Sequence, residues 1–314
     1  MFLEQGIKPE NKFWKYIIGF LFVAASVILG RMLIMLVIFI NSHLSANQLP
    51  ENTNESLGYL SPNIVLLLMA FGYIITNFIL FLIVKYLHRQ TWQSVISARP
   101  RIDWKRILFA FGISAFLWIS IHALGIYLMP EDQTLNFRLI PFLNYLVVAI
   151  VMAFISCFAE QLFFRGYLMQ GVANLVGNRW SLLLIISVIN ALLYLFHPEV
   201  RFLGFLEMFL TLLPYSLFLG VLTLMDEGIE ICYGFHTASL LVQQLIFTSD
   251  NTSLKTDALY VSFESDTDTV NWLVFVPYLI IFPLFLYVCS KKYKWTGWSE
   301  KLTGKIQYPV NNNI

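Results

Sequence analysis

The stretch PFLNYLVVAIVMAFISCFAEQLFFRGYLMQG occupies residues 141–171 and decides the fold of this chain. Its first part, as far as Ala159, is long and apolar enough to cross the ~30 Å hydrocarbon layer of a membrane as one helix. The run then continues through two ionisable residues, Glu160 and Arg165. A charged group in hydrocarbon costs at least about 2.5–3.5 kcal/mol, so each one is a candidate for function. The stretch therefore predicts a membrane helix that carries a polar site.

The composition of the whole chain agrees with this prediction. Its 314 residues are 58% hydrophobic and only 12% charged, with a net charge of +1, and the mean hydropathy is +0.70. Soluble domains are about 45–50% apolar and about 25% charged. This composition excludes a disordered chain, a collagen-like repeat and a nucleic-acid-binding protein, and it favours a polytopic membrane protein that contacts lipid.

Eight apolar stretches predict an all-α, polytopic transmembrane helical bundle of about eight spans. We expect residues 1–13 to form a cytoplasmic N-terminal segment, residues 14–290 the bundle, and residues 291–314 a cytoplasmic C-terminal tail. The stretches are Trp14–Ile40, Pro62–Leu87, Ile107–Leu128, Pro141–Phe164, Ser181–Phe196, Phe202–Met225, Ile229–Phe247 and Val270–Ser290.

The charges of the connecting segments predict the orientation of the bundle. Lysine and arginine gather in the N-terminal segment, in residues 88–106 and in the C-terminal tail, whereas the connection 249–269 is acidic. Alternating spans place the three basic segments on one side, and the basic side of a membrane protein is cytoplasmic. We therefore expect a multi-pass protein of a bacterial cytoplasmic membrane, with both termini in the cytoplasm.

Three ionisable side chains are predicted to meet inside the bundle. Glu160 precedes the expected turn at Gly177 by seventeen residues, and Tyr194 follows that turn by the same number, with His197 one helical turn beyond. At 1.5 Å per residue, two antiparallel helices would bring Glu160 and His197 to similar heights. The seventh stretch adds His236, whose helix face also carries Ser239.

A carboxylate and two imidazoles in a dry bundle fit more than one chemistry. The carboxylate can activate water as a general base while imidazoles orient the water and stabilise an oxyanion. The same three side chains can hold a divalent metal such as zinc. A proton relay in a transporter and purely structural polar contacts are further interpretations that the spacing alone leaves open.

Three motifs in this region resemble those of the CAAX-processing and bacteriocin-processing (CPBP, or Abi) intramembrane endopeptidases. EQLFFR at residues 160–165 resembles the motif EExxxR, and ALLYLFH at 191–197 resembles FxxxH. GFHTASL at 234–240 resembles the third motif, in which asparagine follows a histidine by four residues. The resemblance covers about residues 140–245 and keeps the order of the motifs.

The resemblance implies an endopeptidase of the glutamic or metallo type that cleaves a peptide within or at the membrane. It implies that Glu160 activates the attacking water, that His197 helps to hold this water, and that His236 assists the oxyanion. Arg165 matches the motif arginine, which orients carboxylates. We favour a metal-free site without a cofactor, because a single carboxylate remains in the first motif; a metal site would use Glu160, His197 and His236.

The chain departs from the motifs at two important positions. Gln161 replaces the second glutamate, so we expect it to bond Arg165 without charge and Arg165 to rely on Glu160. Leu240 replaces the asparagine that would donate to the oxyanion, and the hydroxyl of Ser239 is the expected substitute. These departures raise the alternative of a catalytically impaired relative that acts as an immunity or regulatory membrane protein.

The heights of the site residues predict one further feature of the fold. Glu160 lies about 25 Å from the turn near residue 177, but His236 lies only about 12 Å from Gly228. The two side chains can meet only if the fourth helix extends beyond the bilayer on the cytoplasmic side. We therefore expect a long fourth helix, broken near Gly171, and a site that opens toward the cytoplasmic half.

Overall fold

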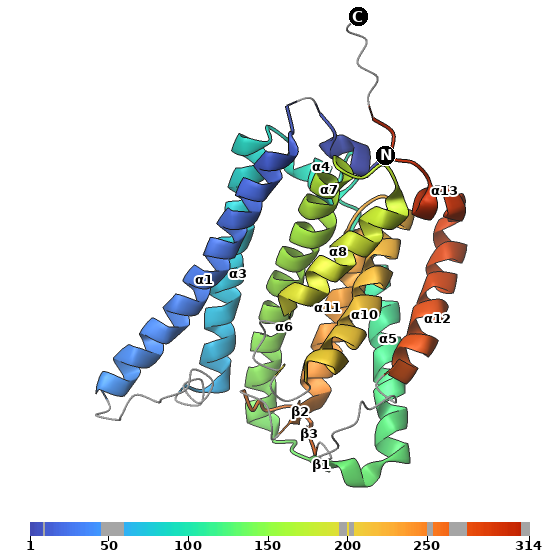
Figure 1. Ribbon diagram of the computed structural model, residues 1–314. Helices are drawn as coiled ribbons and strands as arrows, with labels where there is room; N and C mark the ends of the chain where they lie inside the picture. The colour runs from blue at the N-terminus through green and yellow to red at the C-terminus, as the bar shows by residue number, and fades with distance from the viewer. Residues whose placement is uncertain are drawn as a thin grey trace, which may run out of the picture.

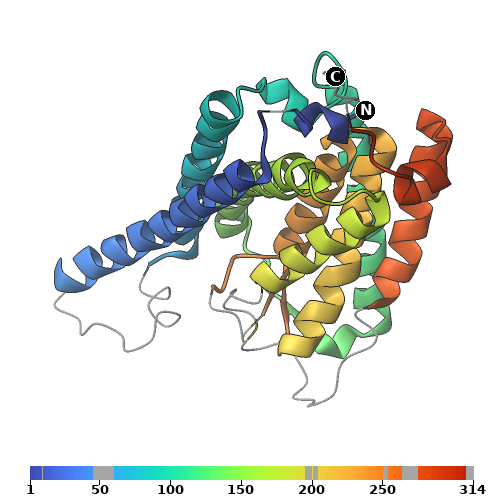
Figure 2. The same cartoon turned by 45° about the horizontal axis from the view of Figure 1, so that its top comes forward.

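The computed structural model describes residues 1–8, 10–44, 60–194, 200, 204–249, 254–263 and 275–308 as a bundle of helices. Helices α1 and α3 form one side of the bundle and α12 the other, with α6, α8, α10 and α11 between them (Figures 1 and 2). The helical elements are η1 (Leu3–Gly6), α1 (Phe13–Leu44), α3 (Pro62–Leu82), η2 (Ile83–Leu87), α4 (Trp92–Ile96), α5 (Trp104–Leu128), η3 (Pro130–Asp132), α6 (Leu139–Gln161), η4 (Leu162–Leu168), α7 (Met169–Ala173), α8 (Arg179–Tyr194), α10 (Phe205–Asp226), α11 (Glu230–Ile246), α12 (Val276–Tyr293) and α13 (Trp298–Thr303).

The all-α polytopic architecture is confirmed, whereas the number of about eight spans is not. Each predicted apolar stretch contains a helix, but only five helices of the described chain are long and apolar enough to cross a membrane. They are Phe13–Leu44, Pro62–Leu87, Trp104–Leu128, Leu139–Ala173 and Phe205–Asp226. Helices α8, α11 and α12 have 16, 17 and 18 residues. At 1.5 Å per residue, each of the three is shorter than the ~30 Å hydrocarbon layer.

A small sheet, which the sequence did not predict, lies at the end of the bundle opposite η1 and α13 (Figure 1). Its strands are β1 (Gln133–Leu135), β2 (Phe247–Ser249) and β3 (Tyr260–Ser262). The central strand β3 pairs antiparallel with β1 and parallel with β2. The sheet therefore ties the ends of the α5 and α11 segments together on the side that we predict to be extracytoplasmic.

The fourth predicted span is one long helix, as expected from the distances of Glu160 and His236 from their turns. Helices α6, η4 and α7 run without interruption from Leu139 to Ala173. The expected break near Gly171 does not occur; the irregularity is instead the π-helical segment η4. Gly166 and Gly171 allow close packing there, because a Cβ at these positions would overlap the Val95 carbonyl and the Tyr16 ring, respectively.

The first residues of the chain are part of the bundle rather than a free segment. Phe2 and Leu3 are each 1% exposed and belong to the main apolar core. The Phe2 amide donates to the Glu227 carboxylate at 2.6 Å, and the Gln170 side chain donates to the Phe2 carbonyl. The predicted N-terminal segment therefore begins with a strap that is held across the ends of α7 and α10.

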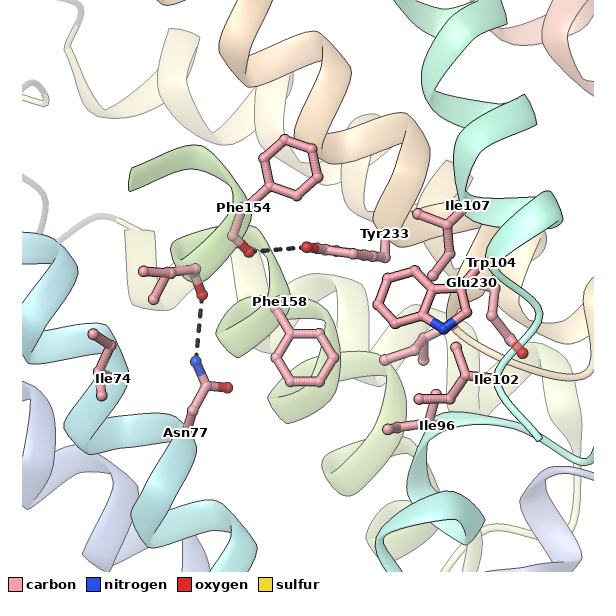
Figure 3. Close-up of a pocket in the computed structure, with 12 residues that line it drawn as sticks. Ile74, Asn77, Ile96, Ile102, Trp104, Ile107, Phe154, Phe158, Glu230 and Tyr233 are labelled. Atoms are coloured by element: carbon pink, nitrogen blue, oxygen red, sulfur yellow. Dashed lines mark hydrogen bonds between the residues drawn. The ribbon is translucent and has the colours of Figure 1, made fainter. Parts of the chain in front are cut away.

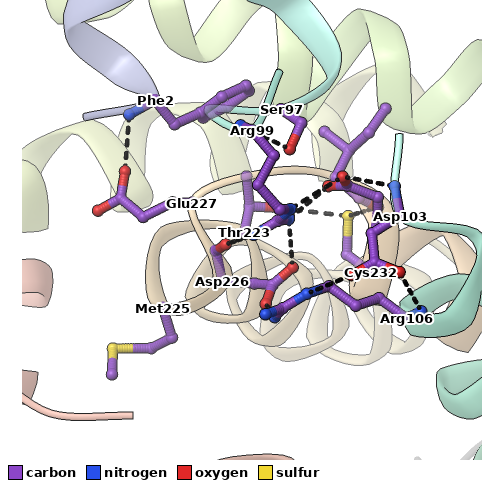
Figure 4. A network of polar contacts seen from close by, with 12 residues as sticks. Phe2, Ser97, Arg99, Asp103, Arg106, Thr223, Met225, Asp226, Glu227 and Cys232 are labelled. Atoms are coloured by element: carbon purple, nitrogen blue, oxygen red, sulfur yellow. Dashed lines mark hydrogen bonds and ion pairs between the residues drawn. The ribbon is translucent and has the colours of Figure 1, made fainter. Parts of the chain in front are cut away.

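A buried network of charges fixes the turn between α10 and α11 (Figure 4). Arg99 donates to Asp226 at 2.9 Å and to Glu230 at 2.7 Å, and Arg106 also pairs with Asp226. The two carboxylate side chains are fully buried. Burial by itself lowers the pKa of Arg99, but the bond to Glu230 and the charges of both carboxylates outweigh it, so the pKa is raised above its ordinary value. The network therefore places the start of α11, the helix that carries His236.

We predict that Arg99→Met lowers the free energy of unfolding by about 3–5 kcal/mol, because the substitution leaves the buried Glu230 carboxylate without its guanidinium. The matched control is Arg101→Met, which removes an exposed arginine two positions away and should change stability by less than about 0.5 kcal/mol. Denaturation of the purified proteins in detergent micelles measures both. Equal stability of the two variants would contradict a structural role for the network.

Candidate active site

Side chains from α6, α8 and α11 converge in the middle of the bundle. Glu160 and Gln161 end α6, Tyr194 ends the described part of α8, and His236 lies within α11. The convergence of these three helices was the central expectation from the sequence. His197, which was expected to complete the site, lies outside the described residues.

The Glu160 carboxylate contacts the other two helices through one oxygen. The Tyr194 hydroxyl donates to Glu160 Oε2 at 2.6 Å. The same oxygen lies 3.8 Å from His236 Nε2, which is beyond a hydrogen bond but within reach of a bridging water. The side chains of Glu160 and His236 remain 18% and 11% exposed, so this acid–imidazole pair is not completely enclosed by the described residues.

Gln161 has a different partner from the one that the sequence suggested. Its side-chain nitrogen lies 2.6 Å from His236 Nδ1 rather than against Arg165. An amide nitrogen can only donate, so Nδ1 accepts and the ring proton resides on Nε2, the nitrogen that faces Glu160. Gln161 therefore orients the imidazole with its N–H toward the carboxylate.

Arg165 is fully buried but does not pair with Glu160 in the described structure. Its Nη2 donates to the carbonyl and the hydroxyl of Ser216 on α10, at 3.0 and 2.9 Å. Its Nε and Nη1 atoms have no hydrogen-bond partner among the described residues. The expectation that Arg165 relies on Glu160 is therefore corrected, because α10 presents two oxygen acceptors to the guanidinium.

The hydroxyl of Ser239 is already engaged by its neighbours. Ser239 donates to the His236 carbonyl at 3.0 Å and therefore accepts from the Tyr215 hydroxyl at 2.6 Å. Leu240, the next residue, packs against the buried apolar cluster of Ile107, Cys157 and Tyr233. The Ser239 hydroxyl hydrogen is therefore already used, and Ser239 cannot replace the motif asparagine as a donor in the expected way.

Sequence reasoning missed three residues around this pair, namely Tyr194, Tyr215 and Ser216. Tyr194 had a detectable signal, because the rise per residue placed it at the height of Glu160. Tyr215 and Ser216 had none, since α10 carries no recognised motif and its rotation toward Arg165 and Ser239 is a tertiary property. The groups that bond Arg165 and Ser239 thus come from α10, a helix that the motifs do not include.

Two of the three expected metal ligands, Glu160 and His236, belong to the described structure. No group of three His, Cys, Asp or Glu side chains in the described part of the chain is arranged to hold an ion. Glu160 and His236 would supply two ligands, with Nε2 losing its proton, and the third residue of the expected set, His197, lies outside the described residues. The described donors therefore form an incomplete metal site.

An apolar cavity of about 380 Å³ lies between α3, α5, α6 and α11 (Figure 3), and neither Glu160 nor His236 is among the residues that line it. Phe158 and Tyr233 line it, and these residues precede Glu160 and His236 by two and three positions. The cavity therefore reaches nearly the same depth in the bundle as the pair. Its other lining residues are Ile74, Asn77, Ile96, Ile102, Trp104, Ile107, Phe154, Ile155, Ile229 and Glu230.

Comparison with known proteins supports the resemblance of the motifs. Residues 141–242 match the family described as "Type II CAAX prenyl endopeptidase Rce1-like". The chain is 24% identical over 248 residues to the "Uncharacterized protein YyaK" of Bacillus subtilis (strain 168), which covers 79% of this chain and 82% of the relative. No solved structure matches the chain. The matched region contains Glu160, Tyr194 and His236, and so includes the whole described site.

We predict that Ser216→Ala lowers the free energy of unfolding by about 1–3 kcal/mol, because it removes an acceptor from the buried Arg165 guanidinium. The control is Ser114→Ala, since the Ser114 hydroxyl also bonds across helices, to the Phe235 carbonyl at 3.1 Å, but without charge. Neutral bonds between membrane helices average about 0.6 kcal/mol. Unfolding in detergent micelles compares the two. A smaller loss for Ser216→Ala than for Ser114→Ala would contradict the charged contact.

Proposed function

Because residues 141–242 match a family of CAAX prenyl endopeptidases, we propose that this chain is an intramembrane endopeptidase. Its substrate is a membrane-associated peptide or protein of the CAAX type or the bacteriocin and leader type. The observation that carries the proposal is the acid–imidazole pair formed by Glu160 and His236, which keeps partial exposure inside an apolar bundle.

The surroundings of Glu160 favour chemistry over a structural ion pair. No lysine or arginine of the described chain lies within 4 Å of this carboxylate, in contrast to Asp226 and Glu230, which arginines neutralise. A carboxylate that is kept in a membrane bundle without a salt bridge depends on its hydrogen bonds and on the more distant charge of Arg165, so its presence points to a functional requirement. This arrangement supports a general base.

The proposed reaction is hydrolysis of one peptide bond. Glu160 takes a proton from water, and the water oxygen forms a bond to the carbonyl carbon. The Nε2–H of His236 stabilises the negative charge that develops on the carbonyl oxygen. The carbon–nitrogen bond then breaks, Glu160 returns its proton to the leaving amine, and the products are a carboxylic acid and an amine. We assign His197 to holding the water, as the resemblance implies.

The apolar cavity at nearly the same depth as the pair fits a substrate that is itself associated with the membrane. Its volume of about 380 Å³ lies within the range of ligand-binding cavities. Aromatic and branched aliphatic side chains dominate its lining, with Glu230 at one end. We assign this cavity to an apolar segment of the substrate.

A second candidate function follows from Leu240. This side chain packs into an apolar cluster at the position where the motif carries an asparagine. Loss of one oxyanion donor typically lowers the rate by about 10²–10³-fold. The alternative is therefore a catalytically impaired relative that uses the same cavity as an immunity or regulatory membrane protein.

We predict that Glu160→Gln lowers peptide cleavage by at least about 10²–10⁴-fold, because the amide cannot accept a proton from water. Purified protein in liposomes is incubated with membrane-anchored CAAX-type and leader-type peptides, and the products are identified by mass spectrometry. Glu207→Gln is the control, since Glu207 also lies in a membrane helix but outside the motifs. Undiminished cleavage by the Glu160→Gln protein would exclude Glu160 as the base.

We further predict that chelation does not abolish this cleavage, because the reaction that we propose uses no metal. The test is dialysis of the liposome-bound protein against a strong zinc chelator, followed by the same peptide assay and by metal analysis of the protein. Retained turnover in metal-depleted protein is the expected result. Activity that disappears on depletion and returns with added zinc would instead assign Glu160, His197 and His236 as ligands.

A further inference from the structure

The proposed hydrolysis lacks one hydrogen-bond donor to the oxyanion, because Leu240 stands where the motif has an asparagine. A tetrahedral intermediate carries a negative charge on the former carbonyl oxygen, and efficient acyl-transfer enzymes provide more than one donor for it. His236 Nε2 is one donor, but the leucine side chain at position 240 has none. Another group close to Glu160 must therefore supply the second hydrogen bond.

The described donors around the pair are mostly committed elsewhere. The Ser239 hydroxyl donates to the His236 carbonyl, and Tyr215 donates to Ser239. Arg165 directs its Nη2 to Ser216, on the side of α10. Its Nε and Nη1 have no partner among the described residues, but Arg165 does not lie within 4 Å of the Glu160 carboxylate. The Gln161 amide nitrogen is held by His236 Nδ1.

Tyr194 has a different geometry, because its hydroxyl donates to the reacting carboxylate itself. The distance from the hydroxyl to Glu160 Oε2 is 2.6 Å. This is the same oxygen that lies 3.8 Å from His236 Nε2, so both donors point into one small volume. Tyr194 also ends the described part of α8, three residues before His197.

We propose that Tyr194 supplies the oxyanion donor that Leu240 lacks. This inference rests on the proposed hydrolysis. Before the reaction, the hydroxyl holds the ionised Glu160 through a charge-assisted bond. When Glu160 takes the proton from water, its carboxyl becomes neutral and binds the hydroxyl less strongly. The hydroxyl then donates a hydrogen bond to the oxyanion that forms at the same moment, while its own proton stays on the tyrosine.

The experiment is a double-mutant cycle between Tyr194 and Leu240 in the liposome peptide assay. Tyr194→Phe should lower kcat by about 10²–10³-fold and leave KM within about threefold, because the donor acts only on the transition state. Leu240→Asn alone should raise kcat by less than about threefold, since a donor is already present. In the Tyr194→Phe background, the same asparagine should restore at least about tenfold of the lost rate.

Controls separate this role from a structural one. Tyr145→Phe removes a hydroxyl that donates to the Gln244 carbonyl at 2.9 Å, away from the site and the cavity, and should leave kcat unchanged. Unfolding in detergent shows whether Tyr194→Phe still folds. A tyrosine that only orients Glu160 would also lower the rate when substituted, but an asparagine at position 240 would not rescue it. Failure of rescue in a folded protein therefore overturns the proposal.

Three other outcomes distinguish this proposal from the proposed function. If Glu160→Gln abolishes cleavage while Tyr194→Phe keeps the full rate, the hydrolysis stands and the role of Tyr194 is wrong. If Leu240→Asn raises the kcat of the otherwise unchanged protein by more than about tenfold, that protein lacks the second oxyanion donor. Tyr194 then does not replace the asparagine. If Glu160→Gln cleaves as fast as the unchanged protein, the proposed function itself fails.

Discussion

A carboxylate inside an apolar bundle must find its hydrogen-bond partners within the protein, because hydrocarbon offers none. Glu160 meets this requirement with a hydrogen bond from one other helix and a nearby imidazole from a second. Tyr194 donates to it from α8, and His236 faces it from α11. This one constraint brings together three helices that are far apart in the chain, and the rest of the site is arranged around it.

The buried carboxylates of this protein have two different kinds of surroundings. Asp226 and Glu230 are enclosed with Arg99 and Arg106, so their charge is neutralised and the α10–α11 turn is held in place. Six residues further along α11, His236 meets a carboxylate that has no such cation among the described residues. The rigid ionic network therefore positions the helix, while the uncompensated pair remains available for proton transfer.

The two departures from the motifs affect separate parts of the site. Gln161 supplies a neutral contact to His236 Nδ1, where a glutamate would hold the ring in its charged form. The glutamine thus favours a neutral imidazole whose Nε2–H faces Glu160. Leu240 removes a donor from the same helix, and its side chain fills an apolar cluster instead. A site with these substitutions depends more strongly on the tyrosines that surround it.

The amino-acid sequence by itself determined the membrane class, the positions of the apolar helices, the order of the motifs and the long fourth helix. These properties depend on local hydrophobicity and on the constant rise of an α-helix. Tertiary structure alone decided that Gln161 contacts His236, that Arg165 contacts Ser216 across 51 residues of chain, and that Tyr194 donates to Glu160. Partner choice depends on how each helix is rotated and tilted against its neighbours, and spacing along one helix carries no information about that rotation. The number of membrane spans could not be predicted from the sequence either, because the described helices α8, α11 and α12 are apolar but short.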